Sequence, residues 1–335
     1  MNEKARAAVI IPNWNGRDDL PACLDSLRGQ SVPVDVVVVE NGSTDGSLEM
    51  LRASYPEVTV LVQPINLGFA GGVNVGLRYA MHRGHSFVAL LNNDAVAAPT
   101  WMEELLAEME RDDGVGMVAS FFVTIDGERI DSTGECYSSW GLPFPRGRGE
   151  PCSDAYAELV DVFGASGGST LYRCDMLRDV GLFDEDFFAY FEDVDLSWRA
   201  QLRGWRVRLA PKAVAYHRIG ATSDRIPGFT TYQTLKNLPW VLIKDVPRGL
   251  LLTVAPRLAL AYALTFWRAV LGGQAGVAVK GAAVAAAKTP RKLRQRREIQ
   301  RSRRIGDAAV RSLLTWDLPP GSTNLRRLRA FLRSS

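Results

Sequence analysis

The chain has 335 residues, of which 47% are hydrophobic, so it can form one large α/β domain with an appendage, and wholesale disorder is excluded. Its four cysteines are far apart without a Cys-x-x-Cys pair, which argues against a zinc knuckle or a compact disulfide framework. From Lys288 onward there are 14 Lys/Arg and 3 Asp/Glu, a local net charge of +11 in a chain of net charge +3. The body is therefore mildly acidic, and the basic tail favours an anionic surface as its partner.

Apolar runs alternate with helical patterns over the first 91 residues. The predicted strands are residues 7–11, 34–39, 58–63 and 87–91, and the predicted helices are residues 20–30, 47–53 and 70–83. This order predicts a mostly parallel, doubly wound sheet. Ligands bind such sheets beyond the carboxyl ends of the strands, and three of these ends, 12–16, 40–43 and 92–94, are polar. We expect the site at that edge.

The pattern changes twice further along the chain. Residues 114–182 indicate shorter strands with glycine turns, 183–203 form a dense acidic-aromatic segment, and 207–216 read as another strand. We therefore expect one domain at 1–225, with halves at 1–113 and 114–225, and a helical, basic extension at 226–335.

Two segments of the first half suit a nucleotide or another polar ligand. Glu40 ends a strand before a helix-capping turn, so it is either part of an ordinary connection or a carboxylate that accepts hydrogen bonds from a base. Residues 66–76 hold four glycines and two asparagines at a helix start, where freed backbone N–H groups suit an anion. The segment is neither a Walker loop nor a dinucleotide fingerprint. Close packing of the helix on the sheet through small residues explains Gly72 and Gly76 well, but it explains Asn66 and Asn74 poorly.

A cation and a base have candidate residues of their own. Asp94 ends a strand at the binding edge, where it either holds Mg²⁺ or Mn²⁺ or caps the next turn. Residues 184–199 carry six acids among aromatic side chains, which should raise carboxyl pKa values. We interpret Asp195 and Arg199 as a structural i,i+4 ion pair and Glu192 or Asp193 as reactive. His217 follows a strand and is either structural or functional.

Taken together, these segments resemble the family 2 glycosyltransferases, and more narrowly their rhamnosyltransferase-like branch. The resemblance runs from Ala7 to Ser223 in an unbroken order of motifs. Residues 39–47 resemble the family's Asp-Asn-x-Ser-x-Asp-Gly-Ser turn, with Glu40 at its first acid. Residues 66–76 match Asn-x-Gly-Phe-Ala-x-x-x-Asn-x-Gly, residues 92–94 stand at the Asp-x-Asp motif, and residues 192–199 match Glu-Asp-x-Asp-Leu-x-x-Arg.

The resemblance implies a GT-A fold and a role for each matched residue. The implied donor-binding residues are Pro12, Asn13, Asn15, Glu40, Asn41, Ser43, Asn66, Gly68, Asn74 and Asn93. The implied ligands of Mg²⁺ or Mn²⁺ are Asp94 and His217, and Asp193, next to Glu192, is the implied catalytic base. We expect the acceptor near Gly167, Gly168 and Trp198.

The implied reaction is one in-line displacement that inverts the anomeric carbon of a nucleotide-diphosphate sugar, such as dTDP-rhamnose. The implied acceptor is a glycan or a lipid-linked glycan of the cell envelope. The processive Gln-x-x-Arg-Trp motif is missing from the sequence, which favours single additions. A relative that binds sugar nucleotides without turnover is the alternative, although Asp94, Glu192 and Asp193 disfavour it. A nucleic-acid-binding protein is a third possibility, disfavoured because the basic run holds no stacking aromatics.

The extension suggests a membrane surface at the cytoplasmic face, and the polar residues 1–6 lack the layout of a secretory signal. Residues 249–273 are apolar enough for a spanning helix, but Pro256, Arg257 and Arg268 oppose it. We therefore expect amphipathic helices over residues 235–272, interrupted by prolines, to lie in the interface, and the basic helix from Lys288 to contact anionic headgroups. The alternative is a helical subdomain packed on the body or on another subunit, as in a homo-oligomer.

Overall fold

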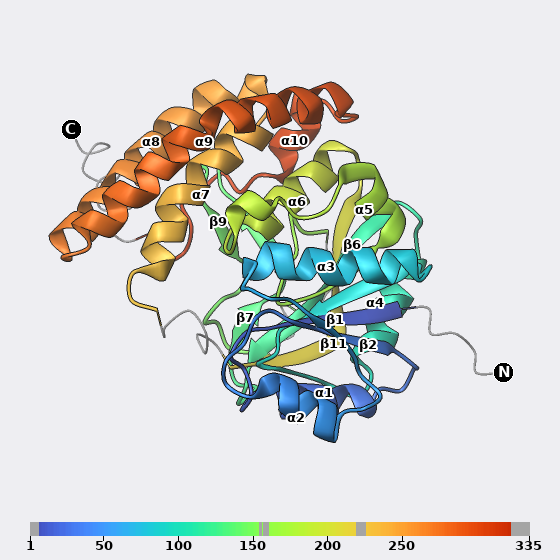
Figure 1. Cartoon of the computed structure of the whole chain (residues 1–335). Helices are drawn as coiled ribbons and strands as arrows, with labels where there is room; N and C mark the ends of the chain where they lie inside the picture. Colours follow the sequence, from blue (N-terminus) through green and yellow to red (C-terminus); the bar gives the residue numbers. More distant parts are fainter. Residues whose placement is uncertain (1–6, 154–155, 157–160, 219–225, 323–335) are drawn as a thin grey trace.

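A central sheet forms because its first strands are apolar on both faces. The computed structural model describes residues 7–153, 156, 161–218 and 226–322, and its strands follow the order β3-β2-β1-β4-β10-β6-β11-β5, with β7 paired to β6 (Figure 1). The first-half strands are β1 (Ala7–Asn13), β2 (Asp35–Glu40), β3 (Thr59–Val62) and β4 (Phe87–Leu91). They pair in parallel, as predicted, and Asn13 lies opposite Glu40 at their carboxyl ends.

The second half of the sheet mixes strand directions. Its strands are β5 (Ala95–Ala97), β6 (Val115–Thr124), β7 (Ile130–Ser132), β10 (Ser169–Arg173) and β11 (Arg206–His217), and β8 (Glu135–Tyr137) pairs with β9 (Pro143–Pro145) in a separate hairpin. β10 runs antiparallel between β4 and β6, with Ser169 opposite Leu91. The turn before β10 therefore lies at the carboxyl end of β4.

Helices cover both faces of the sheet because side chains alternate along each strand. One face packs on α1 (Leu20–Arg28), α2 (Ser47–Ser54) and α4 (Trp101–Glu110), and the other packs on α3 (Gly68–His82), α5 (Cys174–Val180) and α6 (Glu192–Leu202). In β1, Val9 and Ile11 belong to the first core, whereas Ala8 and Ile10 belong to the second. This layering fixes the polar strand ends along one edge.

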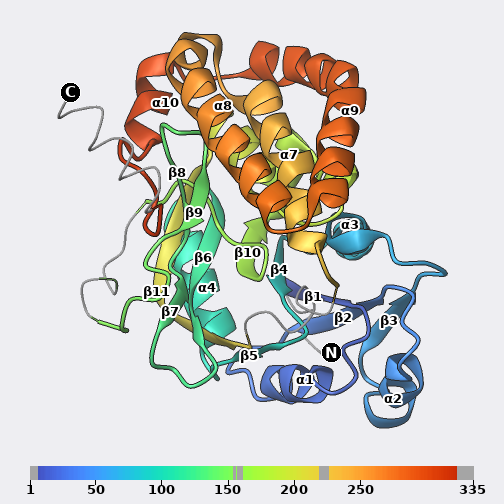
Figure 2. The same ribbon diagram turned by 90° about the vertical axis from the view of Figure 1, so that its left-hand side faces the viewer.

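The C-terminal helices lie over α6 (Figures 1 and 2). They are α7 (Phe229–Asp245), α8 (Arg248–Leu271), α9 (Ala275–Ser302) and α10 (Asp307–Leu313). Trp198 and Leu202 of α6 share a third apolar cluster with Trp240 of α7 and Leu250 of α8. Because Leu196 and Ala200 belong to the apolar core between α6 and the sheet, α6 is buried on two sides.

The prolines of the extension affect the helices less than their number suggests. Pro239 and Pro256 lie inside α7 and α8, and only Pro247 separates two helices. Because proline has no N–H, Pro239 leaves the carbonyl of Leu235 without its usual helical donor. The hydroxyl of Tyr262 on α8 donates to that carbonyl at 2.8 Å. Contacts between helices thus compensate for the lost bond.

The extension only partly matches the surface helices expected from the sequence. Much of α7 is buried, including Leu235, Leu238 and Trp240, so this helix is core rather than interfacial. By length and composition α8 could cross a membrane, with a mean hydropathy of 1.5 over an 18-residue window of which 22% is buried. Its exposed surface is mostly apolar, with Arg248 and Arg268 as exposed charges near its two ends.

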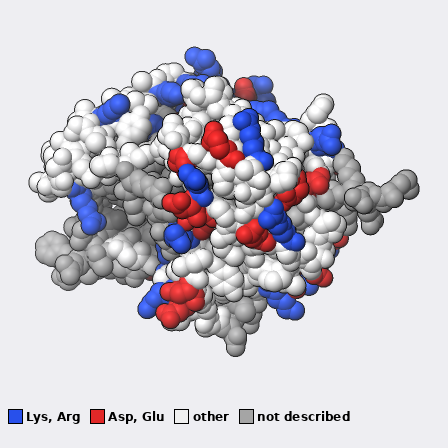
Figure 3. Space-filling view, turned by 60° about the horizontal axis from the view of Figure 1, so that its bottom comes forward, with Lys and Arg blue, Asp and Glu red and all other residues white. Residues whose placement is uncertain are grey.

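The basic residues of α9 face in two directions. Lys288, Arg291 and Lys292 pair with Asp186. The side chain of Lys292 is completely buried, so the expectation that it contacts headgroups is wrong. Arg294, Arg297 and Arg301 are exposed and line a shallow hollow. On the face shown in Figure 3, basic and acidic side chains are interspersed, so that face presents no field of one sign.

Candidate active site

A chain of polar contacts joins the carboxyl ends of three neighbouring strands. The amide of Asn93 donates to Oδ1 of Asn13 at 2.8 Å, and Nδ2 of Asn13 donates to Glu40 at 2.7 Å. The other carboxylate oxygen of Glu40 accepts from the backbone N–H of Ser43 at 2.8 Å, and the Ser43 hydroxyl accepts from the N–H of Asn15 at 2.9 Å. Pro12 immediately precedes Asn13 in β1. These residues, which the sequence analysis predicted to bind the sugar-nucleotide donor, therefore lie together.

Asn41 and Asn66 shape the start of α3. Nδ2 of Asn41 donates to the carbonyl of Gly68 at 3.0 Å, and its Oδ1 accepts from the N–H of Leu67 at 3.0 Å. Oδ1 of Asn66 accepts from the N–H of Gly68 at 2.8 Å. Gly68 has a φ of +74°, and a Cβ there would lie 2.5 Å from the carbonyl oxygen of Phe188, so only glycine fits.

The structure contradicts the donor-binding assignment of Asn74. Its amide donates to the carbonyl of Phe183 at 2.8 Å and to the carboxylate of Glu185 at 2.9 Å, and its Oδ1 accepts from the N–H of Phe183 at 3.0 Å. These bonds use both N–H groups of the amide and one lone pair of its oxygen, and Asn74 is buried. Asn74 lies in the second turn of α3, where it joins this helix to the acidic segment.

Asp94 and His217 are adjacent because β11 pairs with β5. Nε2 of His217 lies 3.2 Å from Oδ1 of Asp94, and its Nδ1 lies 2.8 Å from Oδ2 of Asp131. Asp131 also pairs with Arg148 at 2.7 Å. Burial alone would lower the pKa of His217, but its hydrogen bonds with Asp131 and Asp94 raise that pKa to about 9. Sequence reasoning missed Asp131 and Arg148, which lie outside the motifs that it singled out.

The donor set at Asp94 is compatible with a divalent cation that is completed by a ligand. Within the described residues, no group of three or more His, Cys, Asp or Glu side chains could enclose a metal ion by itself. One carboxylate beside one imidazole nevertheless suits an ion whose remaining ligands are phosphate oxygens and water, and binding of the ion would displace the proton that the raised pKa keeps on the imidazole. The side chains of both residues are largely buried, 8% and 13% exposed, which fixes their positions.

Glu192 and Asp193 begin α6 beside the glycine turn that precedes β10. Oδ2 of Asp193 accepts from the N–H of Gly167 at 3.1 Å, and Oδ1 accepts from the N–H of Val194 at 2.8 Å. Burial raises the pKa of Asp193, although the N–H donors partly oppose this. Burial and, to a smaller extent, repulsion from Asp193 raise the pKa of Glu192 well above its ordinary value. Asp193 is partly accessible, whereas Glu192 is buried.

The glycine turn connects the two groups of polar residues. The carbonyl of Gly168 accepts from the N–H of Asn92 at 2.9 Å, just before Asp94, while Gly167 donates to Asp193. A Cβ at Gly167 would lie 3.0 Å from the ring of Phe69, so the turn is tightly packed. The turn therefore places Asp193 next to the binding edge of the sheet.

Glu135 is another carboxyl group that sequence reasoning missed. Burial and, to a smaller extent, repulsion from Asp193 raise the pKa of Glu135 to about 8. Its carboxylate accepts from the hydroxyl of Ser132 at 3.2 Å. Glu135 lies in a short hairpin strand far from the acidic segment in sequence, so no local pattern pointed to it.

Trp198 belongs to the core, which contradicts its assignment to the acceptor region. Its side chain is completely buried, and its ring centroid lies 4.9 Å from Tyr137 and 5.0 Å from Phe163. The structural pair of Asp195 and Arg199 is confirmed, with Nε of Arg199 2.9 Å from Oδ2 of Asp195.

The acids of the segment 184–195 divide into two groups, contrary to the uniform rise in pKa that was predicted. Burial would raise the pKa of Asp184, but the ammonium groups of Lys244 and Lys292 lower it well below its ordinary value. The pKa of Asp186 is also lowered, because Lys288 and Lys292 outweigh burial. Within this segment, Glu192 and Asp193 have raised pKa values.

A mixed sheet with a polar edge, a carboxylate–imidazole pair and an acid at the start of α6 fit the GT-A fold of nucleotide-sugar transferases. The model of the family "Glycosyl transferase family 2" matches residues 8–181. The chain belongs to this glycosyltransferase family.

A curated relative and two solved structures agree with this family. The N-acetylglucosaminyl-diphospho-decaprenol L-rhamnosyltransferase of Mycobacterium tuberculosis is 30% identical over 217 residues, covering 58% of this chain and 70% of that protein. The structure of GalNAc-T7 with UDP, GalNAc and Mn²⁺ has a TM-score of 0.58 at 16% identity, covering 73% of this chain but only 48% of that one. The mannosyltransferase PcManGT of Pyrobaculum calidifontis, in complex with GDP-Man and Mn²⁺, has a TM-score of 0.52 at 17% identity and covers 90% and 86%. The structural matches confirm the GT-A fold.

Proposed function

We propose that this glycosyltransferase is an inverting enzyme that transfers rhamnose from dTDP-rhamnose to a hydroxyl of a lipid-linked glycan in cell-envelope synthesis. One observation carries the proposal: the turn at Gly167 and Gly168 joins Asp193 to the strand end that bears Asp94. The proposed base therefore lies at the same edge of the sheet as Asp94 and His217, which we propose to face the diphosphate of the donor. The name of the mycobacterial relative supports rhamnose as the sugar and a diphospho-polyprenol acceptor.

The chemistry is one displacement in which Asp193 takes the proton of the acceptor hydroxyl. The acceptor oxygen then bonds to the anomeric carbon from one side while the bond to the nucleoside diphosphate breaks on the other, which inverts the configuration. The pKa of Asp193, raised by burial, favours it as a general base. Asn13, Glu40 and Ser43 would orient the nucleotide, which supplies the positional part of the acceleration.

A divalent cation, Mg²⁺ or Mn²⁺, held by Asp94 and His217 would stabilise the negative charge of the leaving diphosphate. Asp94→Ala should abolish the dependence of donor binding on Mn²⁺, measured by titration calorimetry with and without the ion. Asp113→Ala, at an exposed acid of the same half, is the control. An unchanged response to Mn²⁺ in Asp94→Ala would refute this metal site.

Donor hydrolysis tests the substrate without knowledge of the acceptor. The full chain is incubated with dTDP-rhamnose, UDP-GlcNAc or GDP-mannose and either ion, and release of the nucleoside diphosphate is measured. We expect the highest rate with dTDP-rhamnose and, once an acceptor is supplied, an inverted product by NMR. A preference for another donor contradicts the assignment of rhamnose. Donor binding without any turnover would instead favour a non-catalytic relative.

We also propose that α8 attaches the enzyme to the cytoplasmic face of the membrane as a peripheral protein. Its outward side exposes large apolar side chains, with Leu252 92%, Leu271 86% and Trp267 60% exposed. The guanidinium of Arg257, the charge that opposed a membrane role, is half-buried and donates to the hydroxyl of Ser139 at 2.9 Å. The exposed arginines of α9 can add electrostatic attraction to anionic lipids.

Vesicle sedimentation tests this attachment. We expect the full chain to bind phosphatidylcholine vesicles that contain phosphatidylglycerol, more weakly at high salt, and not to bind single-stranded DNA. The double variant Leu252→Gln/Trp267→Gln should lose vesicle binding, whereas Ile125→Gln, at an exposed apolar residue of the body, should keep it. Wild-type protein that remains in the supernatant at low salt would refute the proposal.

A further inference from the structure

The segment just before Asp193 has an unfavourable backbone. Phe188, Tyr190 and Phe191 have φ values of +64°, +66° and +71°, and in the described chain only Asn15 shares this property among residues other than glycine. L-residues with large side chains are disfavoured in this left-handed region, and such conformations persist only where surrounding contacts hold them. The segment therefore needs support from outside itself.

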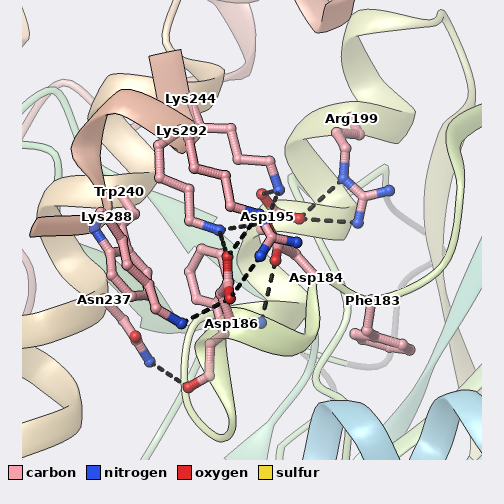
Figure 4. Close-up of polar contacts among 12 residues, drawn as sticks. Phe183, Asp184, Asp186, Asp195, Arg199, Asn237, Trp240, Lys244, Lys288 and Lys292 are labelled. Atoms are coloured by element: carbon pink, nitrogen blue, oxygen red, sulfur yellow. Dashed lines mark hydrogen bonds and ion pairs between the residues drawn. The ribbon is translucent and has the colours of Figure 1, made fainter. Parts of the chain in front are cut away.

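Support comes from α7 of the extension. Nδ2 of Asn237 lies 3.0, 2.9 and 2.8 Å from the carbonyl oxygens of Phe187, Ala189 and Tyr190. Asn237 is completely buried, and Figure 4 shows its amide directed at this segment. The preceding residue on the helix, Lys236, donates to the carbonyl of Phe187 at 3.0 Å. One helix thus binds the backbone before and between the unfavourable residues.

Ion pairs fasten the same segment at its N-terminal end. Oδ2 of Asp184 lies 2.7 Å from the ammonium groups of both Lys244 and Lys292, and Asp186 lies 2.9 Å from Lys292 and 2.8 Å from Lys288 (Figure 4). The side chain of Lys292 is completely buried. The 3₁₀ helix η2 (Glu185–Phe187) is therefore held by both α7 and α9.

The other side of the segment contacts the proposed donor and base sites. The carbonyl of Phe188 accepts from the N–H of Ala70 in the first turn of α3 at 3.1 Å. The carbonyl of Phe191 accepts from the N–H of Asp195, which sets the first turn of α6 and with it Asp193. Displacement of this segment would therefore move the base relative to the donor.

We infer that Asn237 is a positioning residue for sugar transfer: it holds segment 187–191 in the conformation that places Asp193, so the C-terminal helices are part of the active-site scaffold. This inference depends on the proposed role of Asp193 as the base. An active site can lose about 100-fold in rate when a group is displaced by about 1 Å. Asn237→Ala should accordingly lower kcat by about 10- to 100-fold, with a smaller change in donor KM.

The matched control is Gln300→Ala, which removes a hydrogen bond from α9 to the carbonyl of Asp245 on α7 without touching the segment. Thermal unfolding of both variants shows whether they are equally folded. Asn237→Ser, which keeps one donor, should give an intermediate kcat and replaces Asn237→Ala if that variant does not fold. Near-normal kcat in a folded Asn237 variant, or an equal loss in Gln300→Ala, would overturn the inference.

A double variant separates positioning from stability. If Asn237 acts through Asp193, then adding Asn237→Ala to Asp193→Asn should lower the residual kcat little further, because the base is already lost. A full additional loss would show that Asn237 acts by another route and would refute the inference. Should Asp193→Asn alone retain its rate, the proposed base fails instead, so the two failures are distinguishable.

Discussion

Asp193 and Glu192 are neighbours in sequence but occupy different surroundings. Asp193 is partly accessible and accepts hydrogen bonds from two backbone N–H groups, whereas Glu192 is buried and one of its carboxyl oxygens has no hydrogen-bond partner among the described residues. Burial raises both pKa values, and each charge opposes ionisation of the other. Their environments therefore favour Asp193 as the residue that exchanges a proton with the acceptor.

Substitution of the two acids tests this division of roles. Asp193→Asn keeps the shape of the side chain but cannot take a proton, so kcat should fall by about 10²–10⁴-fold while donor affinity stays nearly constant. Glu192→Gln should leave a larger residual rate, because the carboxyl group it replaces is buried. Transfer rates and donor affinities of both variants decide the matter. The roles are reversed if Glu192→Gln loses its rate and Asp193→Asn does not.

The pH dependence should follow from the raised pKa of Asp193. A base acts in its ionised form, so kcat/KM should fall as the pH is lowered through this pKa, at a higher pH than the ordinary carboxyl value of about 4. The residual activity of Asp193→Asn should lack this acidic limb. An identical limb in wild type and variant would assign it to another group.

At the level of elements, α6 connects the sheet to the C-terminal helices. Its residues contribute to two apolar clusters, and its buried pair Asp195 and Arg199 also contacts Lys244 of α7, whose ammonium lies 2.5 Å from Oδ1 of Asp195. Removal of one partner of a buried ion pair leaves an uncompensated charge, which is more harmful than the pair is beneficial. The start of α6 thus depends on elements distant in sequence.

Asp195→Asn should therefore destabilise the fold. We expect the free energy of unfolding to fall by about 3 kcal/mol, since Lys244 and Arg199 lose their shared partner. Denaturant titration followed by circular dichroism measures this change. Asp175→Asn, at an exposed pair with Arg178 in α5, should have almost no effect. Similar unfolding midpoints for the two variants would contradict the expectation.

At the scale of the whole molecule, the extension and the body share a core. Trp198 and Leu202 of the body pack with Trp240, Val241 and Leu250 of the extension, and the lysines of α7 and α9 neutralise the acids that precede α6. The boundary expected near residue 226 thus divides the sequence by composition and helix content, whereas the apolar cluster continues across it.

Truncation after Ile226 tests this dependence. The shortened chain would expose the outer side of α6 to water, an apolar patch that promotes association. We expect it to aggregate or to bind a hydrophobic dye, and to lose vesicle binding because α8 is missing. Size-exclusion chromatography with light scattering provides the measurement. A soluble, monomeric and active fragment would show that the extension serves membrane attachment alone.

The sequence by itself determined the first half of the sheet and most of the binding edge. Buried parallel strands are continuous apolar runs, and their polar ends must meet at one edge, so Asn13, Glu40 and Asn93 were predictable. The pairing of Asp195 with Arg199 was equally readable, because residues four apart lie together on a helix.

Only the tertiary structure decided which of the predicted site residues contact other parts of the protein instead of a ligand. Asn74 and Trp198 lie in motifs that resemble ligand sites. In the structure, however, the amide of Asn74 binds the backbone of Phe183. The ring of Trp198 packs against the rings of Tyr137 and Phe163. The basic residues of α9 were all expected to face anionic headgroups, because charge in a sequence carries no direction. Asp184 and Asp186, the partners of Lys292, lie about a hundred residues earlier, and only folding brings these opposite charges together where Lys292 is completely buried.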